Sequence, residues 1–161
     1  MKKSKNSASS DSRRAFPTTE TMASTPLSDL ITYNPTHHAH LLPQIATLHA
    51  LCITTDNTLA TFLPPLSHSK ILASWTAWSA QVESGHRVIL LQLAEDEVAG
   101  VVSLNCPETE TGSHRGEVGR LLVSPEWRMR GIARKLMEEV EKVAGERGRW
   151  LLVSRYCSTL L

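Results

Sequence analysis

The sequence has few cysteines, almost no excess charge and no long hydrophobic run. Its three cysteines, Cys52, Cys106 and Cys157, are widely spaced and contain no Cys-x-x-Cys pair, so neither a zinc site nor a redox motif is indicated. The formal net charge of +1 gives no broad attraction to nucleic acid or to an anionic membrane. No apolar run approaches the roughly 18 residues of a membrane span, and the polar first residues predict no secretory signal. We therefore expect a cytoplasmic protein without a nucleic-acid or membrane partner.

Size and composition are those of one soluble domain. The chain has 161 residues, of which 41% are hydrophobic and 20% charged, enough to bury a proper core. Its first residues are mainly Ser, Thr, Lys and Arg, with too few large apolar groups to pack. We predict a disordered polar tail over residues 1–26 and a folded domain over residues 27–161.

Hydrophobic periodicity predicts strands and helices before the last third of the chain. Asn34-Pro35-Thr36 offers a helix cap, and Pro43 falls early in the helix that follows, where its missing N–H costs least. The acidic turn Glu95-Asp96-Glu97 joins two apolar runs into an antiparallel hairpin. The predicted elements are a strand at 27–33, a helix reaching Cys52, a helix at about 67–83, and hairpin strands at 87–94 and 98–104.

One later stretch combines a buried strand, a basic turn and an amphipathic helix. The strand is Val118–Val123, and Ser124-Pro125 closes it because proline has no N–H for a sheet ladder. The helix begins near Ile132, and its first turn, Arg-Gly-Ile-Ala, has unsatisfied N–H groups at the positive end of the helix dipole. A right-handed crossover then makes Trp150–Val153 a parallel neighbour of the first strand. The turn is predicted to bind phosphate.

Two kinds of residue favour an anion at this turn. Gly131 and Ala133 leave the N–H groups open, because a bulkier side chain would stand between them and the anion. Arg128 and Arg130 add positive charge. The turn has neither the Gly-Lys-Ser/Thr ending of an NTPase loop nor the Gly-x-Gly-x-x-Gly of a dinucleotide fold.

The motif Arg-x-x-Gly-x-Ala at Arg128–Ala133, placed after a strand that ends in Val-x-Pro, resembles the acetyl-CoA signature of the GNAT superfamily of N-acetyltransferases. The longer run from Gly116 to Val143 looks most like the tabtoxin-resistance type of small-molecule acetyltransferase, within a resemblance that extends from Ser67 to Val153. It implies an α/β (α+β) fold with a mixed, mostly antiparallel sheet flanked by helices. It also implies an acetyltransferase domain over residues 27–161.

The resemblance implies that acetyl-CoA is the acyl donor and that a primary amine of a small molecule attacks it directly. Backbone groups of Leu121, Leu122 and Val123 would pair with the pantetheine arm and polarise the thioester carbonyl. The basic turn would hold the pyrophosphate, and no metal is implied. The residues of that turn are Arg128, Met129, Arg130, Gly131, Ile132 and Ala133. The alternative is a non-catalytic CoA-binding or regulatory module that keeps the fold.

A general base is needed because an amine substrate arrives mostly as ammonium. Family members often use a carboxylate on the strand before the basic turn, and Glu117 is the matching candidate. Its alternative is a surface glutamate at a strand end. His114 is the second candidate, since imidazoles titrate near neutral pH, although loop histidines are usually only solvated. Arg120 is interpreted as structural or as facing the acceptor.

Three clusters invite functional interpretations for which the structural one is favoured. His37, His38 and His40 lie together, but no nearby Cys or carboxylate completes a metal-binding set. Trp75 and Trp78 could stack on a base or a sugar, but their spacing within an apolar stripe is more typical of core. Nucleic-acid binding through the basic turn is disfavoured by the acidic residues on the helix that follows.

The C-terminal part departs from the family pattern. In relatives, the strand matching Leu151–Val153 is followed by a helix and further strands, which often supply a tyrosine that protonates the departing thiolate. This sequence ends at Leu161, and Tyr156 falls at the wrong place for that role. We therefore expect an incomplete fold that binds the coenzyme but transfers acetyl poorly or not at all. Its last strand would be an exposed edge, able to form a homodimer.

Overall fold

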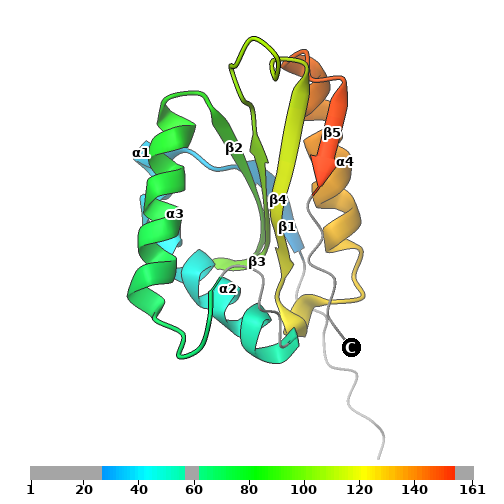
Figure 1. The fold of residues 1–161 in the computed structure, drawn as a ribbon. Helices are drawn as coiled ribbons and strands as arrows, with labels where there is room; N and C mark the ends of the chain where they lie inside the picture. Colours follow the sequence, from blue (N-terminus) through cyan, green and yellow to red (C-terminus); the bar gives the residue numbers. More distant parts are fainter. Residues whose placement is uncertain (1–26, 57–61, 155–161) are drawn as a thin grey trace, which may run out of the picture.

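The computed structural model describes residues 27–56 and 62–154; the predicted polar tail, Tyr156 and Cys157 lie outside them. It contains a five-stranded sheet in the order β1-β2-β3-β4-β5 (Figure 1). Neighbouring strands are antiparallel from β1 to β4, whereas β4 and β5 are parallel, as predicted from the helical crossover between them. The strands are β1 Leu27–Thr32, β2 Arg87–Ala94, β3 Glu97–Asn105, β4 Arg115–Val123 and β5 Leu151–Ser154.

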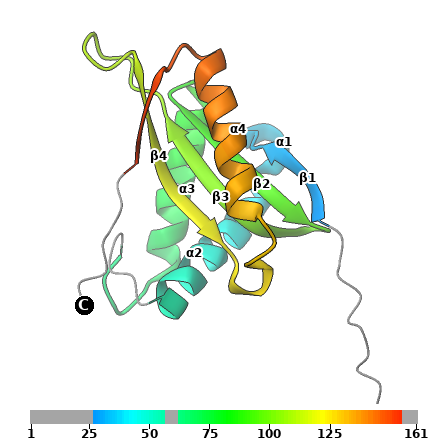
Figure 2. The ribbon, with the colours of Figure 1, turned by 90° about the vertical axis from the view of Figure 1, so that its right-hand side faces the viewer.

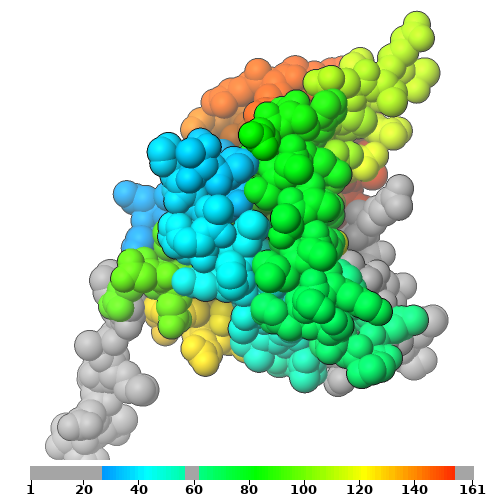
Figure 3. All heavy atoms as spheres, turned by 90° about the vertical axis from the view of Figure 1, so that its left-hand side faces the viewer, coloured from blue at the N-terminus to red at the C-terminus, as the bar shows by residue number. Residues whose placement is uncertain are grey.

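Helices cover both faces of the sheet. One face carries α1, α2 and α3 side by side (Figures 1 and 3), and the other carries α4 (Figure 2). The predicted mixed, mostly antiparallel sheet flanked by helices is therefore confirmed. The helices are α1 Pro35–His38, α2 Leu42–Asp56, α3 His68–Glu83 and α4 Ile132–Glu146, with 3-10 turns at Ala39–Leu41 and Pro125–Trp127.

The sheet separates two hydrophobic cores. On the side of α2 and α3, Ile45 and Trp75 pack with β2 and β3, and on the other side Leu136 and Val140 of α4 pack against the same strands. Because both faces are covered, β2 and β3 are buried at nearly every position. This explains why they read as continuous apolar runs in the sequence rather than as an alternating pattern.

The first predicted helix is divided. Oδ1 of Asn34 caps α1 by accepting hydrogen bonds from the N–H groups of Thr36 and His37, at 2.8 and 3.3 Å. The backbone then leaves the helical region at His38, with φ −114° and ψ 11°, and a 3-10 turn leads into α2. Pro43 is the second residue of α2, where no intrahelical N–H is required. The cap and the proline are where the sequence placed them, but the break is not visible in the pattern.

A glycine in β3 lets α4 lie close to the sheet. A Cβ built on Gly100 would stand 2.7 Å from Cγ2 of Ile132 and 3.1 Å from Cδ1 of Leu136. The absence of a side chain at Gly100 leaves room for this approach. Gly100 is opposite Val123 at the end of β4, so the contact sets the first turn of α4 beside the end of that strand.

Candidate active site

The turn between β4 and α4 presents backbone N–H groups on its surface. Met129 and Gly131 take positive φ angles of 61° and 77°, and the helix begins at Ile132. A left-handed residue followed by a right-handed one directs successive N–H groups toward a common point, which is a geometry that binds anions. Met129, Arg130 and Gly131 are exposed, so the turn is open to a ligand.

These N–H groups have no competing acceptor. Within residues 27–56 and 62–154, the N–H groups of residues 129–134 donate to no acceptor, and α4 has no side-chain cap. They lie at the positive end of the α4 dipole. A Cβ at Gly131 would meet nothing within 4 Å, so the space beside this residue is open. The turn therefore fits a diphosphate, and contact of Gly131, Ile132 and Ala133 with that group stays a prediction.

The two arginines of the turn have different surroundings. Arg128 forms a two-point ion pair with Asp56 at the end of α2, with both nitrogen–oxygen distances 2.8 Å. This hydrogen-bonded pair raises the pKa of Arg128. Arg130 is exposed and stands 4.6 Å from the centre of the Trp127 ring. Arg128 thus ties the turn to α2, and Arg130 is the cation left to face an anion.

β4 has an open edge beside this turn. Among the described residues, β5 pairs with β4 only from Arg115 to Val118, so Gly119–Val123 has no partner strand on that side. Figure 1 shows β5 next to the upper part of β4 and the turn at the lower end of β4. An extended ligand that contains amide groups can pair with such an edge as an added strand.

Alternate residues of β4 supply the backbone groups at this edge. The N–H of Ser124 donates to the carbonyl of Ala99 in β3 at 2.9 Å. Because antiparallel strands alternate, Leu122 also bonds toward β3, whereas Leu121 and Val123 point their backbone groups toward the open side. The pantetheine contacts predicted for Leu121 and Val123 therefore fit the geometry. The backbone of Leu122 belongs instead to the β3–β4 ladder.

The carbonyl of Val123 is already engaged. It accepts hydrogen bonds from Nε of Arg128 at 3.3 Å and from Sγ of Cys52 at 3.5 Å. Burial raises the pKa of the Cys52 thiol, so it acts as a donor and not as a thiolate nucleophile. Among residues 27–56 and 62–154, no backbone partner faces the N–H and carbonyl of Leu121 or the N–H of Val123 at this edge.

A bulge interrupts β4 in its middle. The pairing with β3 shifts by one residue, so that Arg120 and Leu121 stand opposite Val102 alone. Arg120 takes a φ of 52°, which is unusual for any residue except glycine. The extra residue reverses the faces of the strand: Val118 packs on the α4 side, whereas Leu122 packs on the side of α2 and α3.

The bulge directs Arg120 toward α3. Its Nη2 donates to Oγ of Ser74 at 2.7 Å, and its guanidinium lies 3.7 Å from the centre of the Trp78 ring. Burial, together with the positive charge of Arg87, lowers the pKa of Arg120 to about 10. The hydrogen bond to Ser74 and the stacking on Trp78 thus hold this side chain in place. Its backbone directly precedes that of Leu121.

Glu117 is fixed on β4 by two contacts. One carboxylate oxygen lies 3.2 Å from Nη2 of Arg115, and the other accepts a hydrogen bond from Nδ2 of Asn105 at 3.3 Å. The side chain is about one-third exposed, so water reaches it. Leu121 is four residues away, roughly 13 Å along a strand. A proton from an amine at the open edge would therefore reach Glu117 through water.

His114 lies at the other end of the strand. Its ring stacks on Trp150 with the ring centres 4.9 Å apart, in the connection that precedes β4. Seven residues separate it from Leu121, roughly 23 Å along a strand. The carboxylate of Glu117 is therefore the better-placed base of the two.

Three further expectations can be compared with the described ranges. Trp75 is fully buried, as predicted for core, whereas Trp78 is only partly buried and stacks on two arginines. Around the His37–His40 cluster, and elsewhere in these ranges, no group of three or more His, Cys, Asp or Glu side chains lies close enough to hold a metal. None of the helices found there has the length and apolarity needed to cross a membrane.

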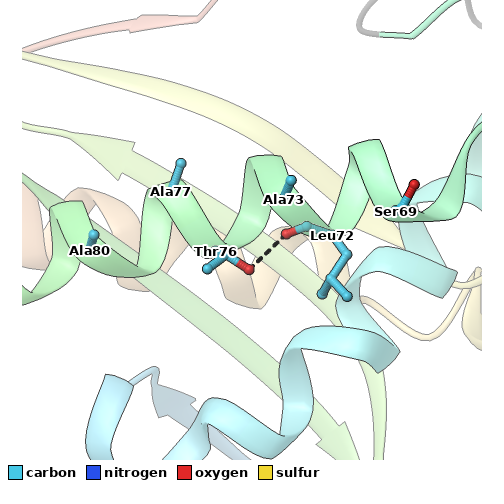
Figure 4. Close-up of a pocket in the computed structure, with 6 residues that line it drawn as sticks. All are labelled: Ser69, Leu72, Ala73, Thr76, Ala77 and Ala80. Carbon is cyan, nitrogen blue, oxygen red and sulfur yellow. Dashed lines mark hydrogen bonds between the residues drawn. The ribbon is translucent and has the colours of Figure 1, made fainter.

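A shallow hollow of about 620 Å³ lies on the outer side of α3 (Figure 4). Both of its lining hydroxyls are hydrogen-bonded: Thr76 donates to the carbonyl of Leu72 at 3.0 Å, and Oγ of Ser69 lies 2.8 Å from Oγ of Ser67. No lining residue belongs to β4 or to the turn before α4, so the hollow is separate from the candidate site. The lining residues are Ser69, Leu72, Ala73, Thr76, Ala77 and Ala80.

The sequence matches the model of the acetyltransferase (GNAT) family over residues 53–155. That span is more than half of the chain and contains β4, the basic turn and α4. The chain therefore belongs to the GNAT acetyltransferase family, whose acyl donor is acetyl-CoA.

Solved structures with the same fold are distant in sequence. An acetyltransferase from Clostridium acetobutylicum, crystallised with acetyl-CoA, is 13% identical with a TM-score of 0.58, over 80% of each chain. A ribosomal-protein-alanine N-acetyltransferase from Brucella melitensis is 22% identical with a TM-score of 0.63, over 79% of this chain and 73% of that one. An aminoglycoside acetyltransferase from an uncultured soil metagenomic sample, in complex with sisomicin, is 14% identical with a TM-score of 0.57, over 80% and 77%. At these identities the likeness establishes the fold.

Proposed function

We propose that this chain is an acetyl-CoA-dependent N-acetyltransferase that acts on the primary amine of a small molecule. One observation carries the proposal: within the described residues, the open N–H groups of residues 129–134 lie directly beside the open edge of β4. The first fits the diphosphate of the donor, and the second fits its amide-containing arm. Membership of the family supports the same chemistry.

Different residues of the chain bind the donor, stabilise the developing charge and accept the proton. The turn and Arg130 bind the diphosphate, and the N–H groups of Leu121 and Val123 can donate to the thioester oxygen as it gains negative charge. Acetyl-CoA supplies an activated acyl carbon. Glu117 accepts, through water, the proton that the substrate ammonium must lose. The amine nitrogen bonds to the acyl carbon as the C–S bond breaks, and the proton that this nitrogen then releases ends on the departing sulfur.

Two measurements on the full chain test this proposal. Calorimetry and thermal melting with CoA test binding, and thiol release from acetyl-CoA with a panel of amines tests transfer. Binding followed by release supports the acetyltransferase. Binding without release favours the non-catalytic CoA-binding or regulatory module. The absence of both binding and stabilisation by CoA overturns both functions.

Three finer predictions belong to this proposal: the tabtoxin-resistance subtype, the small-molecule acceptor and the cytoplasmic location. The structural neighbours include one complex with an aminoglycoside and one enzyme named for a ribosomal protein. Sisomicin and a peptide with an N-terminal alanine therefore belong in the acceptor panel. Turnover of the peptide alone would contradict the small-molecule acceptor.

Replacing the base should slow transfer and leave donor binding intact. Glu117→Gln is expected to lower kcat roughly 100- to 10,000-fold, because the amide cannot accept a proton. The loss should shrink at high pH, where the amine is already neutral. Glu138→Gln, at an exposed position on α4, is the control. A kcat equal to that of the wild type across the pH range would remove Glu117 from the mechanism.

We also propose that the chain forms a homodimer through β5. Within the described residues no strand pairs with the outer edge of β5. Leu151 and Val153, on one side of this strand, are 41% and 40% exposed, and Trp150 just before it is 79% exposed. An open edge with exposed apolar side chains is a template for pairing with another chain.

A further inference from the structure

Two arginines hold their guanidinium groups against one indole ring. The Cζ atoms of Arg120 and Arg87 lie 3.7 and 3.8 Å from the centre of the Trp78 ring. Two guanidinium groups at that height would overlap on a single face, so Trp78 lies between them. Among the described residues neither arginine forms an ion pair with a carboxylate. The ring attracts both cations but offers their N–H groups no acceptor.

The hydrogen bonds of the two arginines differ. Arg87 donates from Nε to Oε1 of Gln81 at 2.7 Å and from Nη1 to Oγ of Ser103 at 3.3 Å. Arg120 donates from Nη2 to Oγ of Ser74. Its Nη1 is buried and has no hydrogen-bond partner in the described part of the chain. A buried donor without an acceptor is rare and unfavourable, because it has lost its hydration without replacement.

The residue that carries the unpaired donor is a neighbour in sequence of the open edge. Arg120 directly precedes Leu121, whose N–H and carbonyl face the open edge of β4. Glu117, three residues earlier, points to the same side of the sheet as Arg120, since Val118 points to the α4 side. An acceptor held by Arg120 would therefore lie on the same side of the sheet as the proposed base.

We propose that Nη1 of Arg120 binds an anionic group of the acceptor, a carboxylate or a phosphate, so that the substrates are amines with a negative charge a few bonds from the nitrogen. The inference rests on the proposed function and names its substrate class. Trp75 and Phe62, with ring centres 4.9 and 5.9 Å from the guanidinium, complete an aromatic surround. In such a site a charge-assisted hydrogen bond is strong. Polyamines and aminoglycosides would leave the donor unpaired and bring a like charge beside it.

A matched series of amines tests the substrate class. Propylamine, β-alanine and O-phosphoethanolamine share a two-carbon arm and carry a methyl, a carboxylate and a phosphate. We expect kcat/KM for at least one anionic amine to exceed that for propylamine roughly tenfold to a hundredfold, the range of one hydrogen bond to a charged group. The preferred anion distinguishes amino acids from phosphorylated amines. Equal values for all three amines would overturn the inference and leave the proposed function intact.

Variants of Arg120 test the residue. Arg120→Lys and Arg120→Met should bring the ratio of anionic to neutral kcat/KM toward 1, with folding checked by thermal melting. Lys70→Met removes an exposed cation from α3, the helix that carries Trp78, and should keep the ratio of the wild type. A ratio that is unchanged in folded Arg120 variants contradicts the assignment.

If no amine is acetylated, a binding measurement on the wild-type protein still tests the anion site. Burial, together with the positive charge of Arg120, lowers the pKa of His49 to about 4. An anion on Arg120 offsets that charge, so the pKa of His49, followed by NMR, should rise in phosphate or in trifluoroacetate, a carboxylate that stays ionised near pH 4, relative to chloride at equal ionic strength. Absence of thiol release then speaks against the proposed function, and an unchanged pKa of His49 overturns the anion site.

Discussion

Individual side chains of the basic turn take their roles from partners far away in the sequence. Arg128 and Arg130 are equivalent in the motif, yet Asp56, at the end of α2, pairs with Arg128 through two hydrogen bonds. Both side chains of the pair are 37% exposed, so its contribution to stability is expected to be small, about 0.2–1 kcal/mol. Its effect is positional, because it joins α2 to the turn. Nothing in the sequence around Asp56 indicates this partner.

His49 should make stability depend on pH. It is buried, and its Nδ1 accepts a hydrogen bond from Nε1 of Trp75 at 3.2 Å, which requires the neutral ring. Burial, together with the charge of Arg120, lowers the pKa of His49 from 6.5 to about 4. Between these values the unfolded state binds the extra proton, so stability should fall as pH falls from about 6.5 to 4, by up to about 3 kcal/mol.

Urea unfolding between pH 7.5 and 4 measures this effect. His49→Gln retains an acceptor for Trp75 and cannot titrate, so its stability should vary less over the same range. Carboxylates that titrate near the lower limit affect both proteins, so the difference between them is the informative quantity. Parallel pH profiles for wild type and His49→Gln would show that His49 does not carry the effect.

At the scale of elements, glycine substitutions at the two ends of α4 distinguish an effect on acetyl-CoA binding from an effect of backbone strain. Gly131 before the helix and Gly148 after it have φ angles of 77° and 70°, and a Cβ on either meets nothing within 4 Å. Gly131→Ala and Gly148→Ala should therefore destabilise the protein alike, by about 1–2 kcal/mol. Only Gly131→Ala places a methyl group in front of the open N–H groups. Its acetyl-CoA affinity should fall roughly tenfold or more, as expected for a lost charge-assisted hydrogen bond.

Calorimetry on both variants, with denaturant unfolding for stability, checks this pair. Equal loss of acetyl-CoA affinity in the two would mean that strain, and not access to the turn, governs binding. Unchanged affinity in Gly131→Ala would place the diphosphate elsewhere.

The elements themselves were predictable to different degrees. α4 is predictable because its apolar positions repeat every 3.6 residues. The hairpin is predictable because turn residues bound its two apolar runs. The bulge in β4 does not follow, since both faces of the strand are covered and either register buries apolar groups. β4 also begins at Arg115, earlier than the predicted Val118, because its first residues pair with β3 and β5. Register thus depended on neighbours that are distant in the chain.

For the whole molecule, the exposed side of β5 predicts self-association. Wild-type protein should sediment as a dimer at micromolar concentrations, and Val153→Lys should shift it to monomer, because a charged edge opposes strand pairing. Leu63→Lys changes an apolar side chain that is 73% exposed outside the sheet, and it should leave the dimer intact. A monomer at all concentrations, or equal effects of the two substitutions, would rule out β5 as the interface.

The sequence by itself determined the basic turn, the helix that follows it, the hairpin and the family, because these depend on local backbone chemistry and on periodic burial. Tertiary structure alone decided that Arg128 pairs with Asp56 and that Leu122 bonds to β3. It also decided that Arg120 reaches Trp78 with one nitrogen that has no partner in the described part of the chain. Each of these depends on packing two layers of helices around a bulged strand. Such contacts join residues that are far apart in the sequence, and no local sequence pattern predicts them.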